Sequence, residues 1–319
     1  MRKLYCVAAI GLAFAVLSVF PARPALASTL LVRGSVAARA NQPTSQGSAV
    51  ADKWATVFGV KIHYLEAGSG PDVILLHGLG GDASNWASTI GPLSQKYHVI
   101  VPDQVGFGKS DKPVIPYRVG TLVDFLDSFM SVLKISKASL VGNSLGGWTA
   151  AAFALAHPDK VDRLVLVDAA GFSLEKGVDP HVLNGLNPST REGVKQLMSL
   201  VVYNKAMFDN PATLDLLFAR KMATGDGYTI QQFINSIING EDVLDNTVSG
   251  IKQPTLIVWG KQDMLVPLAT GERYHKSISG SELLVFDKCG HVPMLEQANQ
   301  FNSGLMKFLA GEQPEGLSQ

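Results

Sequence analysis

The stretch ASLVGNSLGGWTAAAFALAHP, residues 138–158, decides the fold, because its residues change character at one point. An apolar run typical of a buried strand leads into Gly142-Asn143-Ser144-Leu145-Gly146, and an alanine-rich run typical of a helix follows. A strand that turns at once into a helix strains the central residue, and a side chain at either flanking glycine would collide with neighbouring backbone. The turn presents the serine hydroxyl at the sheet edge, beside a helix N-terminus. We therefore predict that Ser144 is a nucleophile.

A serine hydroxyl is a poor nucleophile near neutral pH, so it needs a histidine base and a carboxylate that orients the histidine. On this strand–turn–helix arrangement the partners follow in the order serine, acid, histidine, each just past a later strand. Asp263 follows the apolar run TLIVWG (255–260), and His291 follows ELLVFDKCG (282–290). Asp168 follows the run RLVLVD and stays open as the alternative acid.

Strand-like and helix-like segments alternate through most of the chain. Helical patterning covers 119–134 and 146–156, between runs rich in valine, isoleucine and leucine at 72–78, 98–103, 138–144, 163–169, 255–260 and 282–290. Continuous apolar strands joined by helical crossovers indicate a mostly parallel sheet with helices on both faces. The two β-rich runs around Gly59, within 54–68, predict an antiparallel hairpin ahead of this sheet.

The alternation stops once, between residues 171 and 250, where strand patterns are missing and helical patterns occur, as in PATLDLLFARKMATG and YTIQQFINSIING. A structureless loop of this length is improbable in a compact domain, so we predict a helical cap. The predicted organisation is then a core of residues 53–170 and 251–312, the cap at 171–250 and a short tail at 313–319. Residues 28–52 are small and polar and are interpreted as a flexible leader.

The first 27 residues have the composition of a secretory signal peptide. Arg2 and Lys3 precede an apolar run that ends at Phe20, and Ala25-Leu26-Ala27 forms a small-x-small cleavage site. We expect cleavage near Ala27 and export to the periplasm or the medium, without a stable membrane span afterwards. An uncleaved membrane anchor is the alternative, although the run is short for spanning a bilayer.

Charge and cysteine content exclude several classes of partner. The 27 basic and 27 acidic residues balance, which gives no electrostatic reason to expect nucleic acid. Of the two cysteines, Cys6 lies in the signal, so Cys289 has no partner for a disulfide within the exported chain. Scattered histidines and the lack of an H-E-x-x-H motif suggest no metal, and we expect no cofactor.

The glycines at 78–81 allow two interpretations. Gly78, Gly80 and Ala83 fit G-x-G-x-x-G/A after a strand, and Asp103 ends the next strand, as in a dinucleotide site. A dinucleotide fold would use its first strand, whereas this run follows a hairpin. Because the strand–turn–helix around Ser144 comes later in the chain, we favour a loop whose backbone approaches a reacting carbonyl.

The chain resembles the α/β-hydrolase superfamily from about residue 53 to 312. The resemblance rests on LLHGLGG (75–81), VPDQVGFGKSDKP (101–113), LVGNSLGG (140–147), LIVWGKQDMLVP (256–267) and CGHVPMLEQANQFN (289–302). It implies the α/β-hydrolase fold, with Ser144 as nucleophile, Asp263 as acid and His291 as general base. It also implies an oxyanion hole made by the backbone N–H groups of Leu79 and Leu145. Some family members place the acid at the position of Asp168.

The resemblance extends to the type of reaction. A serine nucleophile favours hydrolysis of a small carboxylic ester through an acyl-enzyme over the branches that use an aspartate nucleophile. The stretches GNSLGG (142–147) and ISGSELLVFDKCGH (278–291) also resemble carbon–carbon bond hydrolases of aromatic ring-fission products, in which a cap arginine at the position of Arg220 binds a carboxylate. Those enzymes typically follow the histidine with WAQWE, where this chain has VPMLE. A catalytically silent binding protein of the same fold is a further alternative.

Overall fold

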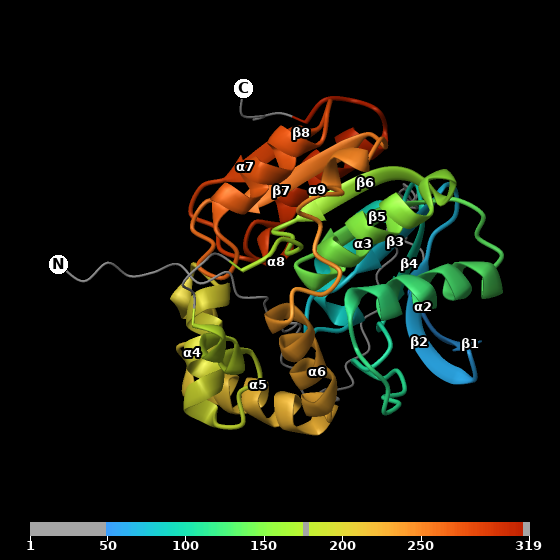
Figure 1. Ribbon diagram of the computed structural model, residues 1–319. Helices are drawn as coiled ribbons and strands as arrows, with labels where there is room; N and C mark the ends of the chain where they lie inside the picture. The colour runs from blue at the N-terminus through green and yellow to red at the C-terminus, as the bar shows by residue number, and fades with distance from the viewer. Residues whose placement is uncertain (1–48, 175–178, 315–319) are drawn as a thin grey trace, which may run out of the picture.

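The computed structural model describes residues 49–174 and 179–314. Within them the strands form one sheet in the order β1-β2-β4-β3-β5-β6-β7-β8. β1 is antiparallel to β2 and β2 to β4, whereas all other neighbours are parallel. The predicted mostly parallel sheet with an antiparallel N-terminal hairpin is therefore confirmed (Figure 1). The strands are β1 (Ala51–Val57), β2 (Val60–Ala67), β3 (Asp72–Leu76), β4 (His98–Pro102), β5 (Ala138–Asn143), β6 (Val161–Val167), β7 (Thr255–Gly260) and β8 (Glu282–Phe286).

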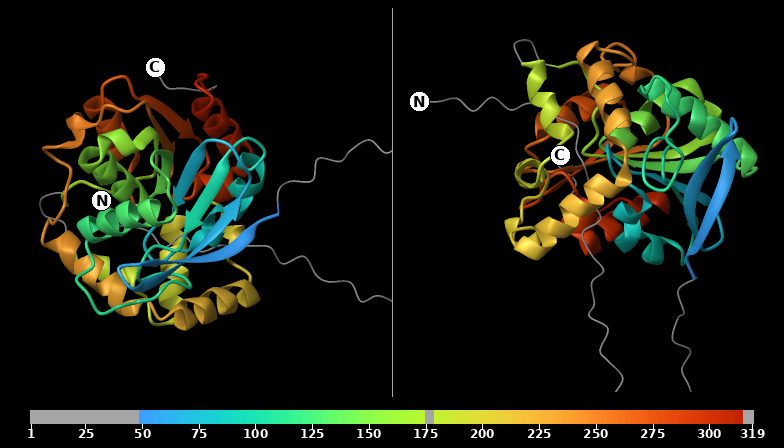
Figure 2. Two further views of the ribbon diagram at one scale, coloured as in Figure 1. Left: turned by 90° about the vertical axis from the view of Figure 1, so that its right-hand side faces the viewer. Right: turned by 90° about the horizontal axis from the view of Figure 1, so that it is seen from below.

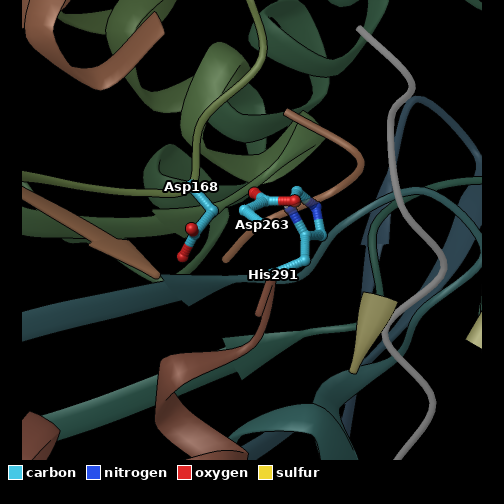
Figure 3. Close-up of side chains that lie close together, drawn as sticks. All are labelled: Asp168, Asp263 and His291. Carbon is cyan, nitrogen blue, oxygen red and sulfur yellow. The ribbon is translucent and has the colours of Figure 1, made fainter. Parts of the chain in front are cut away.

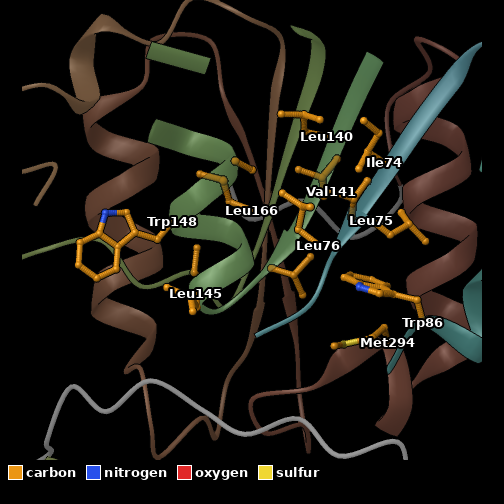
Figure 4. Close-up of a cluster of buried hydrophobic side chains, with 14 of the residues drawn as sticks. Ile74, Leu75, Leu76, Trp86, Leu140, Val141, Leu145, Trp148, Leu166 and Met294 are labelled. Carbon is orange, nitrogen blue, oxygen red and sulfur yellow. The ribbon is translucent and has the colours of Figure 1, made fainter. Parts of the chain in front are cut away.

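The central strands are apolar along their whole length because the sheet is covered on both faces. Every residue of β5 and of β7 is buried. Ile74 of β3 pairs with Leu140 of β5, which pairs in turn with Leu164 of β6. Figure 4 shows Trp148 on one side of this sheet core, and Trp86 and Met294 on the other.

Helices cover both faces of the sheet. On one face α2 packs against α3, and on the other α1 packs against α9, where the Trp86 and Phe301 rings lie 6.1 Å apart. The helices of the core are α1 (Ala87–Leu93), α2 (Val119–Val132), α3 (Leu145–Ala156), α7 (Leu268–Ser277), α8 (Pro293–Glu296) and α9 (Ala298–Leu309). Short 3-10 turns occur at Ala83–Trp86 (η1), Pro158–Lys160 (η2) and Val248–Gly250 (η5).

A helical cap is inserted between β6 and β7. It contains η3 (Pro180–Leu186), α4 (Arg191–Val201), η4 (Lys205–Met207), α5 (Pro211–Thr224) and α6 (Gly227–Ile238). Figures 1 and 2 show α4, α5 and α6 grouped outside the sheet. The two patterns quoted from the sequence correspond to α5 and α6. The first cap helix, α4, begins at a Thr190 N-cap whose hydroxyl accepts the Gly193 N–H at 3.0 Å.

The core begins slightly earlier in the chain than predicted. β1 begins at Ala51, two residues before the predicted start of the core and inside the segment interpreted as a leader. Its pairing with β2 starts at the same residue, with Ala51 opposite Glu66. The predicted signal peptide lies outside the described residues. Among the described residues, no helix has the length and apolar character that crossing a membrane requires.

Candidate active site

Ser144 lies at the turn between β5 and α3, where the sequence predicts it. Its backbone angles are φ 57° and ψ −117°, a strained conformation for a residue with a side chain. Two hydrogen bonds to the end of β6 hold this backbone, because Ser144 N–H donates to the Val167 carbonyl at 2.9 Å and Ala170 N–H donates to the Ser144 carbonyl at 3.2 Å. The surrounding sheet therefore fixes the serine at the carboxyl end of β5, at the N-terminus of α3.

The glycines on either side of Ser144 are required by close packing. A Cβ atom at Gly142 would lie 2.2 Å from the Gly146 carbonyl oxygen. A Cβ atom at Gly146 would lie 2.3 Å from the Leu76 carbonyl oxygen and 2.6 Å from that of His77. The N-terminus of α3 therefore packs directly against the chain leaving β3. This contact brings Leu145 close to the turn that carries Leu79.

His77 holds the turn after β3 in place through hydrogen bonds. This fully buried ring has its Nδ1 atom 2.8 Å from the Gly78 carbonyl oxygen, while its Nε2 atom accepts the Gln104 N–H at 3.0 Å. These partners define a neutral imidazole with its proton on Nδ1. Burial lowers the pKa of His77, which keeps it neutral. The Leu79 turn is thereby fixed in place, as the oxyanion-binding role predicted for its backbone would require.

His291 and Asp263 come together although 28 residues separate them in the sequence. His291 Nδ1 lies 2.6 Å from Asp263 Oδ2, and both side chains are fully buried. Asp263 Oδ1 accepts two further hydrogen bonds, from Leu265 N–H at 2.7 Å and Val266 N–H at 3.0 Å. The carboxylate is thus fixed and binds the imidazole through one oxygen, as Figure 3 shows. A carboxylate only accepts, so a ring proton lies on Nδ1, and in the neutral imidazole Nε2 then carries the lone pair.

The loop that bears His291 is anchored to the serine turn and to the cap. Asn143, next to Ser144, donates from Nδ2 to the His291 carbonyl at 3.1 Å. His291 N–H donates to the carbonyl of Val201, at the end of cap helix α4, at 2.8 Å. His291 Nε2 is buried, and none of the described residues gives it a hydrogen-bond partner. A basic nitrogen in this state is suited to accept a proton from a hydroxyl.

Asp168, the alternative acid, lies beside Asp263 at the end of β6. Oxygens of Asp168 and Asp263 and a nitrogen of His291 lie within 4.8 Å of one another, and all three side chains are buried. Figure 3 shows Asp263 between the other two. Asp168 Oδ1 accepts the Gly260 N–H at 2.8 Å. The structure thus places both candidate acids in one cluster, with Asp263 in contact with the histidine.

The same cluster is the one group of potential metal ligands found among the described residues. Within it, Asp263 Oδ1 accepts two backbone N–H groups and Oδ2 binds His291 Nδ1, so these ligand atoms are already used by hydrogen bonds within the protein. A cation bound through His291 Nδ1 would displace the 2.6 Å hydrogen bond to Asp263. The sequence shows no metal-binding motif for this cluster, because its members follow three different strands.

Glu296 supports the histidine loop, a role that was not predicted from the sequence, although it lies in the quoted stretch CGHVPMLEQANQFN (289–302). Its Oε1 atom accepts the Gly290 N–H at 2.8 Å, and Oε2 accepts the Asn204 N–H at 3.0 Å. It therefore joins the loop before His291 to the cap segment after α4. Only the spatial proximity of these segments reveals this role.

Arg220 is placed on cap helix α5, where it forms an ion pair with Asp82. Its Nη2 atom also donates to Ser84 Oγ at 2.7 Å. Burial by itself would raise the pKa of Asp82, but the charge of Arg220 and hydrogen bonds from Ser84 lower it. The guanidinium predicted to bind a substrate carboxylate therefore already binds a carboxylate of the protein. This pair links the cap to the loop that begins at Leu79.

The fold and these side chains define a class of protein. A family model described as "alpha/beta hydrolase fold" matches residues 71–298, and the chain belongs to this family. The strand–turn–helix around Ser144 and the strand-end positions of Asp263 and His291 fit that assignment.

Individual proteins of known structure or function also resemble the chain. The chain is 33% identical over 279 residues to the 2-hydroxy-6-oxononadienedioate/2-hydroxy-6-oxononatrienedioate hydrolase of Escherichia coli K12, covering 79% of this chain and 91% of the relative. A meta-cleavage product hydrolase from Pseudomonas fluorescens IP01 superposes with a TM-score of 0.74 at 31% identity, covering 81% of this chain and 97% of the other. A membrane phospholipase A described as a bacterial virulence factor gives a TM-score of 0.74 at 29% identity, with coverages of 82% and 86%. These relatives support assignment of the chain as a hydrolase.

Proposed function

We propose that the protein is a serine hydrolase that cleaves a small carboxylic ester through an acyl-enzyme intermediate. The observation that carries the proposal is the 2.6 Å contact between His291 Nδ1 and Asp263 Oδ2, on a loop bonded to the residue before Ser144. In this arrangement Asp263 keeps the proton of the imidazole on Nδ1, so that Nε2 is free to act as a base. Ser144 is the nucleophile.

In the acylation step His291 Nε2 takes the proton of Ser144 while the hydroxyl oxygen attacks the ester carbonyl. The charge that develops on the carbonyl oxygen is stabilised by the N–H groups of Leu79 and Leu145, each contributing about 3 kcal/mol by analogy with other enzymes. His291 then gives its proton to the departing alcohol. In deacylation His291 takes a proton from water, the hydroxide attacks the acyl group, and the proton returns to Ser144.

The pairing of Arg220 with Asp82 supports a neutral ester in preference to a carboxylate substrate. A guanidinium that already holds a carboxylate offers little attraction to a second one, because the pair has no net charge. Carbon–carbon bond hydrolysis of a ring-fission dienoate is the second candidate, favoured by the identity to the Escherichia coli relative. That reaction would require the substrate carboxylate to displace Asp82 from Arg220.

The proposal is tested with purified protein and a panel of p-nitrophenyl esters of increasing acyl length, assayed beside a ring-fission dienoate. We expect hydrolysis of short esters and covalent labelling of Ser144 by a fluorophosphonate. Turnover of the dienoate without ester hydrolysis would select the second candidate. Absence of both activities and of labelling would favour the silent binding protein.

The role of Arg220 is tested by the double variant Arg220→Gln/Asp82→Asn, with kinetics on a neutral ester and on a half-ester of a dicarboxylic acid. Because Asp82 neutralises the guanidinium, the double change leaves the net charge unaltered, and we expect KM to change to the same extent for both substrates. Arg191→Gln/Asp215→Asn is a suitable control, since it removes an exposed ion pair elsewhere on the cap. A KM increase confined to the half-ester, of tenfold or more and so about 1.4 kcal/mol, would instead assign carboxylate binding to Arg220.

We propose that the predicted signal peptide directs this activity out of the cytoplasm, so that the ester is one that the cell encounters in the periplasm or the medium. Fractionation of cells that express the full chain, followed by N-terminal sequencing of the exported protein, tests both export and cleavage near Ala27.

A further inference from the structure

We propose that Asp168 is a neutral carboxylic acid that donates a hydrogen bond to Asp263 and acts as a positioning residue for the catalytic carboxylate. The arrangement would extend the serine, histidine and aspartate by a fourth member, which carries a proton of its own. This inference rests on the proposed function only for its kinetic consequences, because the protonation of Asp168 concerns the folded protein itself.

The first argument is the burial of two carboxyl groups together. Asp168 is completely buried, the side chain of Asp263 is fully buried, and oxygens of the two lie within 4.8 Å. Two ionised carboxylates at this distance and out of water would repel one another strongly. Protonation of one group removes the repulsion and converts it into a hydrogen-bond donor.

The second argument identifies which carboxyl group holds the proton. Asp263 accepts hydrogen bonds from Leu265 N–H and Val266 N–H and binds His291 Nδ1, and donors of this kind favour the ionised form. Asp168 Oδ1 accepts a hydrogen bond from Gly260 N–H, whereas Oδ2 is buried and accepts no hydrogen bond from the described residues. A proton between Asp168 and Asp263 supplies the missing bond.

Burial and the charges around Asp168 also favour its protonated form. Burial raises the pKa of Asp168 well above its usual range, and the Asp263 carboxylate and Glu296 raise it further, against the opposing effect of the Gly260 N–H. Cys289 also lies near these acids, and burial raises the pKa of its thiol, so it remains uncharged. The remaining titratable group of the cluster is the His291 imidazole.

The backbone holds Asp168 in position for this bond. Its φ of 44° is in the left-handed region, which aspartate tolerates better than most residues. Asp168 N–H donates to the Val258 carbonyl of β7 at 2.9 Å, so the residue is tied to the strand that leads to Asp263. The neighbours of Asp168 in β6 and beyond, Val167 and Ala170, hold the Ser144 backbone. Asp168 is thus positioned between the serine turn and the acid.

The direct test is infrared spectroscopy of the full-length protein at neutral pH, comparing wild type with Asp168→Asn in H₂O and D₂O. We expect a protonated-carboxyl band in the wild type that shifts in D₂O and is lost in Asp168→Asn. Loss of only a carboxylate band in the variant would overturn the proposal. Elemental analysis is part of the same experiment, because a stoichiometric divalent cation that is lost in Asp168→Asn would also overturn it.

The kinetic test uses Asp168→Asn and Asp168→Ala, after thermal melting has established that each is folded. Asparagine retains a hydrogen-bond donor without a charge, so we expect kcat within about threefold of wild type, whereas alanine lowers kcat by about tenfold. The acid limb of the pH profile of kcat/KM is expected to stay in place in Asp168→Asn, since no charge is removed. An ionised Asp168 would predict a limb displaced to lower pH, because its loss would destabilise the imidazolium.

The two measurements separate this inference from the proposed function. If no ester is hydrolysed but the protonated-carboxyl band is present and lost in Asp168→Asn, the proposed function fails and the protonated Asp168 stands. If esters are hydrolysed and the band is missing, the assignment of the proton fails and the hydrolase stands.

Discussion

Ser144→Ala is expected to lower kcat for ester hydrolysis by about 10⁴-fold or more, with little change in KM. Ser144 supplies the protein atom that becomes bonded to the acyl group in the proposed mechanism, so its loss removes the acyl-enzyme route altogether. The folded structure should tolerate alanine, because the hydroxyl is the only group removed and the strained turn is fixed by backbone bonds to Val167 and Ala170. Initial rates on a short p-nitrophenyl ester and fluorophosphonate labelling measure the effect.

Ser131→Ala is the matched control, because Ser131 is an exposed serine on α2 whose hydroxyl donates to the Asp127 carbonyl. The control should retain wild-type rates and wild-type labelling. Activity that survives in a folded Ser144→Ala variant would remove this residue from the mechanism and with it the acyl-enzyme.

Asp263→Asn is expected to lower kcat by about 10³- to 10⁴-fold, as for the equivalent change in serine proteases. The physical reason is the orientation of the new amide. Leu265 N–H and Val266 N–H both donate to Oδ1, so the amide oxygen must face them. The amide NH₂ group then faces His291 Nδ1 and forces the ring proton onto Nε2, where it prevents His291 from acting as a base. Initial rates across the ester panel measure the loss.

Asp168→Asn provides the comparison for this prediction, because it makes the same chemical change in the neighbouring acid. A large loss in Asp263→Asn with near-normal rates in Asp168→Asn would assign the orienting acid to Asp263. The reverse pattern would transfer that role to Asp168, at the end of β6.

The fold was predictable from the sequence because each layer has its own hydrophobic pattern. Continuous apolar runs such as that of β5 predict strands buried on both faces, and the turn around Ser144 fixes the connection from strand to helix. The start of the core was less predictable. The burial pattern of β1 alternates only weakly, and the strand is defined by its pairing with β2, from Ala51 opposite Glu66. Pairing with the neighbouring strand determines where such an edge strand begins, because few of its own side chains are buried.

The candidate site was predictable to the extent that its members follow strand ends. Strands that run parallel bring their carboxyl ends to one edge, so Ser144, Asp263 and His291 were expected to converge. The sequence alone left Asp168 and Asp263 as alternatives, since both follow strands. The structure brings the two acids together and gives the contact with His291 to Asp263.

Arg220 marks the limit of what sequence determines. The resemblance to carbon–carbon bond hydrolases implies a cation near the substrate at Arg220, but the sequence cannot show that Asp82, 138 residues earlier, lies within reach. The sequence by itself determined the order of strands and helices, the strained serine turn and the set of residues at the strand ends, because these depend on local pattern and topology. Only the tertiary structure decided which charges pair, since the interaction between two charges depends on their separation and burial in space and hardly at all on their separation along the chain.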